Sequence, residues 1–104
     1  MRRFYRRTFL NRRGCHAGAY VLADVFVERS YDRQHVWLNA ELAVADCGRV
    51  VTLDFDISSQ RDVSNALYKA RLLRDVIAAF ASALEDGAVE WACENAKKTT
   101  TRTS

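Results

Sequence analysis

The 104-residue sequence contains no proline and only three cysteines, Cys15, Cys47 and Cys93. Without proline there is no X–Pro bond that could adopt the cis form. The cysteines lie far apart and form no CxxC pair, which argues against a disulfide framework and favours reduced thiols in a cytoplasm. A zinc site built from the three thiols and His16 is the alternative, but it lacks the closely spaced ligand pairs that are usual for zinc.

Long apolar runs and catalytic motifs are also lacking. No run of about 18 apolar residues is present, so we expect no transmembrane helix and no membrane partner. The cationic start, MRRFYRRTFLNRR, is not followed by the apolar stretch of a secretory signal. Asp54 and Asp56 could share a divalent cation, but a nuclease needs a third acid and usually a nearby lysine or histidine. We therefore expect no enzyme, no metal and no cofactor.

What the sequence does have is a globular composition with an uneven distribution of charge. Apolar residues make up 49% and charged residues 28%, as in one soluble domain. Residues 1–16 hold six arginines and no acid, whereas the other 88 residues carry a formal charge of −3. Such asymmetry indicates nucleic-acid or acidic partners, and aromatic residues between the arginines could stack on bases. The candidate nucleic-acid contacts are Arg2, Arg3, Arg6, Arg7, Arg12 and Arg13.

Alternation of apolar and polar residues with period two predicts strands over residues 19–28, 36–45 and 50–57. Residues 4–10 predict a fourth, less regular strand, because Arg6 and Arg7 interrupt the alternation. Turn residues separate the strands, among them Asp46-Cys47-Gly48, so we expect an antiparallel meander.

A long helix is predicted to follow the sheet. Ser59 and Asp62 resemble a capping box, and Gly87 is the expected stop. A short second helix over 88–97 and a disordered tail over 98–104 would complete the chain. The prediction is a single α+β domain, residues 1–97, in which a three- to four-stranded antiparallel β-meander packs against one long C-terminal α-helix. Apolar residues at helical spacing form its core stripe: Val63, Leu67, Ala70, Leu73, Ile77, Phe80 and Leu84.

The predicted helix has more apolar surface than one sheet face requires. A second seam lies beside the core stripe, formed by Leu72, Val76, Ala79 and Ala83. Either the chain's own termini cover this seam, or it contacts a second copy of the chain or another partner.

The outward face of the predicted sheet is the main candidate for function. Alternation places both carboxylates and aromatic rings on it. We call this surface the acidic-aromatic face; its members are Tyr20, Asp24, Phe26, Glu28, Trp37, Glu41, Asp54 and Asp56. Aromatic residues are enriched at interface centres, and spaced carboxylates could imitate nucleic-acid phosphates. The alternatives are that these charges are merely solvated, or that Arg3, Arg6 or Arg7 pairs with them across strands.

These features predict a small non-catalytic cytoplasmic protein that binds a protein partner through the acidic-aromatic face and the helix. Short chains without motifs are common among phage-encoded inhibitors of bacterial systems, including anti-CRISPR proteins, which act in the host cytoplasm; this is an analogy of size and style. The second hypothesis is direct nucleic-acid binding by the N-terminal arginines. The third is a structural role in a larger assembly.

Overall fold

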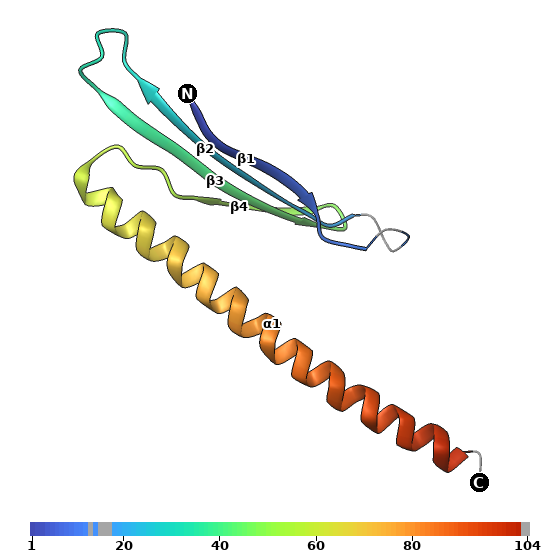
Figure 1. Ribbon diagram of the computed structural model, residues 1–104. Coiled ribbons are helices and arrows are strands. Elements are labelled where there is room, and N and C mark those ends of the chain that lie inside the picture. The colour runs from blue at the N-terminus through green and yellow to red at the C-terminus, as the bar shows by residue number, and fades with distance from the viewer. Residues whose placement is uncertain (13, 15–17, 103–104) are drawn as a thin grey trace. The chain divides into compact units, whose positions relative to one another are not determined.

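The computed structural model describes residues 1–12, 14 and 18–102, with side chains as far as residue 97. Four antiparallel strands lie side by side in chain order and are followed by one long helix (Figure 1). This arrangement confirms the α+β meander. The elements are β1 (Arg2–Phe9), β2 (Tyr20–Arg29), β3 (Val36–Asp46), β4 (Arg49–Asp54) and α1 (Gln60–Arg102). The chain divides into two compact units, Met1–Ala70 and Arg71–Ser104.

The arginine-rich N-terminus is a strand of the sheet. β1 pairs with β2 in antiparallel register from Arg2 to Phe9, with one register shift between Arg2 and Phe4. Met1 extends this pairing, because its carbonyl accepts a hydrogen bond of 2.8 Å from the Val27 amide. Every residue of β1 is exposed. β1 is thus a charged edge strand, which is a common means of preventing one sheet from pairing with another.

A two-residue turn joins β3 and β4. Asp46 and Arg49 pair across it, and the two residues between them, Cys47 and Gly48, have φ of 50° and 83°. Positive φ at both positions is typical of a type I′ turn, whose twist matches that of the flanking strands. The predicted turn at Asp46-Cys47-Gly48 is therefore confirmed.

The two faces of the sheet differ in chemistry, as the alternation predicted. Residues directly opposite each other in an antiparallel sheet share a face, so the register assigns each side chain to one of the two. One face carries the apolar set: Val21, Ala23, Val25, Val27, Leu38, Ala40, Leu42, Val44, Val51 and Leu53. The other face is the acidic-aromatic face.

Small residues alone are deeply buried. Among the described side chains, the buried apolar residues are five alanines: Ala19, Ala40, Ala43, Ala45 and Ala66. Larger apolar side chains stay partly or largely accessible; Val51 on the apolar face, for example, is 62% exposed. A single copy of the chain therefore leaves much of its apolar surface in contact with water.

α1 begins where the capping pattern predicted. The Asp62 amide donates to the Ser59 carbonyl at 3.1 Å. The Asp62 carboxylate accepts hydrogen bonds from the Ser58 amide and hydroxyl, at 3.0 and 3.1 Å. These bonds, led by the one from the Ser58 amide, lower the pKa of Asp62. The carboxylate thus anchors the chain that enters the helix.

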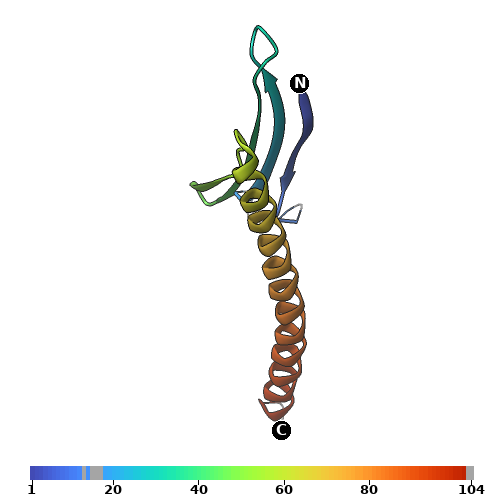
Figure 2. The same cartoon turned by 90° about the vertical axis from the view of Figure 1, so that its left-hand side faces the viewer.

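The predicted stop at Gly87 is wrong, as is the separate helix over 88–97. α1 runs without a break in both views (Figure 1, Figure 2). Glycine ends a helix when it adopts a positive φ, and Gly87 does not adopt one. Of the tail expected over 98–104, residues 98–102 lie within α1, and the last two lie outside the described residues. Within the described chain, α1 has no stretch apolar enough to cross a bilayer.

Candidate functional site

Three carboxylates stand side by side across the acidic-aromatic face. Asp24 on β2 lies directly opposite Glu41 on β3, and Glu41 lies directly opposite Asp54 on β4. Cβ atoms of such opposed pairs are about 4.5–5.5 Å apart, and like charges at this spacing repel each other. We call these three residues the carboxylate row. Its repulsion makes the surface favourable for a cation.

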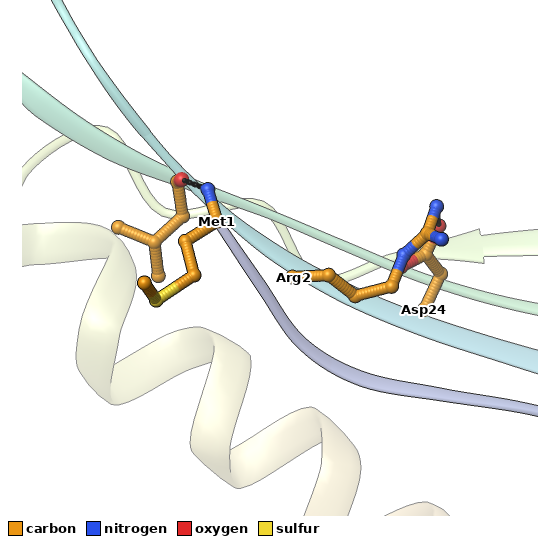
Figure 3. Close-up of polar contacts among 4 residues, drawn as sticks. Met1, Arg2 and Asp24 are labelled. Atoms are coloured by element: carbon orange, nitrogen blue, oxygen red, sulfur yellow. Dashed lines mark hydrogen bonds and ion pairs between the residues drawn. The ribbon is translucent and has the colours of Figure 1, made fainter.

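One end of the row is neutralised from β1. Arg2 Nε lies 3.2 Å from Asp24 Oδ1, and Arg2 Nη2 lies 3.4 Å from Asp24 Oδ2 (Figure 3). The guanidinium also covers the Tyr5 ring, 4.9 Å from its centroid. The two charged side chains are 55% and 30% exposed, so the pair contributes at most about 1 kcal/mol.

An N-terminal arginine does pair with an acid of this face, as one alternative predicted. The arginine is Arg2, however, and not Arg3, Arg6 or Arg7. Arg6 lies opposite Ala23, and Arg7 lies opposite Leu22. Among the described residues, no ion pair reaches Glu41 or Asp54, and both are exposed. Two members of the carboxylate row thus keep their charge facing solvent.

Aromatic side chains flank the carboxylate row. Towards one end of the strands, Trp37 lies opposite Glu28, and the indole Nε1 donates to Glu28 Oε2 at 2.7 Å. Phe26 lies between this pair and the row on the same face. Towards the other end, Tyr20 packs under the Arg7 guanidinium, which lies 5.0 Å from its ring centroid. Seven of the eight expected members of the acidic-aromatic face thus share one side of the sheet.

A hollow of about 460 Å³, open to solvent, lies beside the Glu28–Trp37 pair. It combines aromatic walls with charges of both signs. Its lining residues are Met1, Arg3, Phe26, Val27, Glu28, Arg29 and Trp37. An open hollow of this kind fits an anchoring side chain of a protein partner better than an enclosed small molecule. The residue pattern does not predict that Met1 and Arg3 line this hollow, because only the pairing of β1 with β2 brings them beside Glu28 and Trp37.

Asp56, the eighth predicted member of this face, has a main-chain partner. Its Oδ1 accepts a hydrogen bond of 2.8 Å from the Ala40 amide of β3. β4 ends at Asp54; beyond it the Phe55 amide still donates to the Ala40 carbonyl at 2.8 Å, and the next bridge to β3 is Leu38–Ile57. The Asp56 carboxylate therefore replaces a main-chain carbonyl where the ladder is interrupted. Asp56 is exposed like Asp54, but one of its oxygens is occupied by this structural hydrogen bond.

The arginines of β1 do not form a single patch. Arg6 lies over the Phe4 ring at 5.8 Å, on the same side of the sheet as Ala23. Arg7 lies over the Phe9 ring at 5.5 Å, on the acidic-aromatic face. Arg12 is exposed beyond the strand, and Arg13 lies outside the described residues.

The apolar seam predicted on the helix is exposed. Leu72 is 49% and Val76 is 57% accessible, and Ala79 and Ala83 are also exposed. Of the core stripe over the same turns, Leu73 is half-buried, whereas Ile77 and Phe80 are 57% and 64% accessible. Burial therefore distinguishes the stripe from the seam at Leu73 and not at Ile77 or Phe80.

Metal binding finds no support in the described residues, which contain no group of three or more His, Cys, Asp or Glu placed to hold an ion. Cys15 and His16, named above as candidate ligands, lie outside that part of the chain. Cys47 is exposed at the hairpin tip, where a hydrogen bond to Asp46 raises the pKa of its thiol.

Comparisons with family models, with curated proteins and with solved structures find no match to this chain. The placement of its own residues is thus the basis for a functional proposal.

Proposed function

We propose that this chain is a non-catalytic binding protein whose acidic-aromatic face recognises a basic surface on another protein. The observation that carries the proposal is the carboxylate row, in which Glu41 and Asp54 are exposed and lack an ion pair within the described chain. Binding of cationic side chains would relieve the repulsion within the row. It would also give charge complementarity, which steers association and selects partners.

The hollow beside Trp37 supplies an aromatic anchor point, which the carboxylate row lacks. Interfaces gain most of their affinity from a few buried aromatic or arginine anchors, and charged pairs at their rim contribute less. Phe26 and Trp37 offer such an anchor point next to the charges. A basic groove that normally holds nucleic acid is the kind of surface that this combination fits. Occupying that groove would inhibit the partner, as in the phage-type inhibitors named above.

The test is a charge reversal at the centre of the row, Glu41→Lys. In this variant a lysine would lie between Asp24 and Asp54, so cross-strand repulsion becomes attraction and the fold should be at least as stable. Affinity purification from the native host with the wild-type chain would identify a partner. The affinity of that partner for Glu41→Lys would then be measured by calorimetry, and we expect a loss of at least about tenfold.

The matched control is Glu94→Lys, which makes the same change of charge at a 63% exposed position near the C-terminal end of α1. It should leave the affinity of the partner within about twofold of wild type. Equal affinity of wild type and Glu41→Lys would refute the proposal. Asp56 is unsuitable as a test position because its carboxylate holds the Ala40 amide.

Nucleic-acid binding by β1 is the second candidate. The observation in its favour is that Arg6 and Arg7 are exposed and stacked on aromatic rings, an arrangement that can contact phosphates and bases. Labelled duplex DNA and RNA would be titrated at two salt concentrations with the wild-type chain and with Arg3→Gln/Arg6→Gln/Arg7→Gln. Three lost phosphate contacts would flatten the log–log salt dependence on DNA by roughly 3. Absence of binding by the wild-type chain would remove this candidate.

A further inference from the structure

The apolar stripe of α1 continues far beyond what the sheet could cover. At 43 residues the helix is about 64 Å long. The longest strand, β3, has 11 residues and spans about 37 Å. In the unit Arg71–Ser104, Ile77, Phe80 and Leu84 are 57%, 64% and 60% exposed. Some of this stripe therefore requires an occupant other than the chain's own sheet.

The spacing of the stripe is that of a helix that packs on another helix. Apolar or small residues recur alternately three and four positions apart, which is the heptad pattern of a coiled-coil seam. This row shares six positions with the core stripe, has Ala66 in place of Leu67, and continues to Gly87 and Trp91. Its members are Val63, Ala66, Ala70, Leu73, Ile77, Phe80, Leu84, Gly87 and Trp91. Ala66 is buried and Val63 half-buried within the unit Met1–Ala70. Leu73 is also half-buried, so the large exposed members of the row begin at Ile77.

Charge along α1 is segregated and indicates the direction of the partner helix. Residues 60–74 contain four bases and one acid, whereas residues 75–94 contain five acids and no base. A parallel pair of these helices would place like charge beside like charge over their whole length. An antiparallel pair places the basic part of each helix beside the acidic part of the other.

One antiparallel register satisfies both the side-chain sizes and the charges. With Ile77 opposite Phe80 of a second copy, Leu73 lies opposite Leu84, and Ala70 lies opposite Gly87. The apolar layers are then filled, and the small pair lets the backbones approach each other. In this register Arg71 and Arg74 come beside the segment that contains Glu85 and Asp86 of the other helix.

We infer that the occupant of this seam is a second copy of the chain, packed antiparallel through Leu73–Leu84 of α1. The interface is isologous, because the same residues contribute from both copies. Val76 and Ala83, members of the seam predicted from the sequence, border it. Dimerisation through α1 leaves the acidic-aromatic face to other partners, so this inference stands or falls independently of the proposed function.

A charge swap tests the pairing and its direction together. One variant carries Arg71→Glu/Arg74→Glu, and the other carries Glu85→Lys/Asp86→Lys. In an antiparallel dimer, each variant on its own meets like charge at both ends. We expect each to dimerise at least about tenfold more weakly than wild type by analytical ultracentrifugation. An equimolar mixture restores opposite charges at both ends, so its association should return towards wild type.

The matched control for the swap is Arg12→Glu/Arg29→Glu, which changes charge equally at exposed positions outside α1. It should dimerise like wild type. Circular dichroism of each variant would verify that the helix is retained. A wild-type chain that remains monomeric at every concentration would overturn the inference, and so would a mixture that associates no better than either variant alone.

A spin label at Val89 measures the direction independently. Val89 is 65% exposed and lies off the seam; the label would be introduced as Val89→Cys in a background with the three native cysteines changed to serine. In the proposed register the two Val89 positions are about 31 Å apart along the helix axes. In a parallel dimer they would lie at the same level, about 20 Å apart or closer. The longer distance by pulsed electron paramagnetic resonance supports the antiparallel dimer, and the shorter one refutes it.

Discussion

Two aspartates that stand two positions apart show what one hydrogen bond changes at the scale of a residue. Alternation treats Asp54 and Asp56 alike, as carboxylates on the outer face of one strand. In the structure, Asp54 ends β4 beside Glu41 in the carboxylate row. Asp56 instead accepts a hydrogen bond from the amide of the buried Ala40. The first is available to a partner, and the second repairs an interruption of the sheet.

Substitutions at these two aspartates should have opposite effects on stability. Asp56→Ala leaves the Ala40 amide without its acceptor and should lower the free energy of unfolding by about 1–2 kcal/mol. Asp56→Asn keeps a carbonyl oxygen that can accept from the Ala40 amide, so it should avoid most of that loss. Asp54→Asn removes one like charge from the row and should change stability by less than about 0.5 kcal/mol, in the stabilising direction. Urea denaturation of the three variants checks this; equal losses at both positions would contradict it.

Cys47 occupies a conformation that suits few side chains. Its φ of 50° is the left-handed region, which costs most L-residues roughly 1 kcal/mol and costs asparagine less. Asn-Gly is the favoured pair for a type I′ turn. Cys47→Asn should therefore raise the free energy of unfolding by about 0.5–1 kcal/mol in urea denaturation. Cys47→Ser is the control, since it removes the thiol and keeps the strain; an equal gain in both variants would assign the effect to the thiol.

At the scale of elements, the sequence predicts the bounds of a strand best where every second side chain faces away from water. β2 and β3 agree with their predicted ranges within one residue at either end. β1 begins two residues earlier than expected. As an edge strand exposed along its whole length, it needs no apolar face, so Arg6 and Arg7 interrupt a pattern that its environment does not require. Main-chain hydrogen bonds to β2 hold this strand in the sheet. Because these bonds do not depend on the type of side chain, the residue pattern does not reveal them.

Gly87 tests whether α1 is one helix. A glycine inside a helix is less favourable than alanine by about 1 kcal/mol, whereas a glycine that ends a helix with positive φ is more favourable than alanine. Apart from the neighbouring residues and backbone of the helix itself, no atom lies within 4 Å of the position that a Cβ would occupy at Gly87. Gly87→Ala should therefore raise both the helicity and the stability, by about 0.5–1 kcal/mol. A lower melting temperature for this variant would indicate that the helix ends here.

The start of α1 should respond to acid through Asp62. Hydrogen bonds from Ser58 lower the pKa of this carboxyl below its ordinary value of 3.8. Because the pKa is depressed by folding, the stabilisation is present above pH of about 3.8 and is lost as the pH falls through the lower, folded value. Asp62→Asn should destabilise the protein at pH 7 and have less effect near pH 2.5. Urea denaturation at both pH values checks this, and an equal effect at both would contradict it.

At the scale of the whole molecule, the sequence predicted which residue types share a surface. It did not predict which residues of different strands lie side by side on that surface. The acids and rings of the acidic-aromatic face follow from alternation alone. The Arg2–Asp24 pair, the alignment of the carboxylate row and the hollow beside Trp37 depend on register, which joins residues more than a dozen positions apart. Turn lengths and bulges set that register, and the register shift between Arg2 and Phe4 left no trace in the residue pattern.

Strand β1 covers the main chain of β2 at one edge of the sheet, so the N-terminal segment cannot be removed without consequence. Deleting residues 1–10 would expose the main-chain groups of β2, a ten-residue strand rich in β-branched and aromatic side chains. Such an edge is a template for pairing between molecules. The deleted chain should therefore aggregate, with light scattering rising on concentration. Arg3→Gln/Arg6→Gln/Arg7→Gln keeps the strand and a polar edge, and this variant should remain as dispersed as wild type. A deleted chain that stays dispersed and folded would show that β1 is dispensable to the sheet and would favour its action as an independent binding segment.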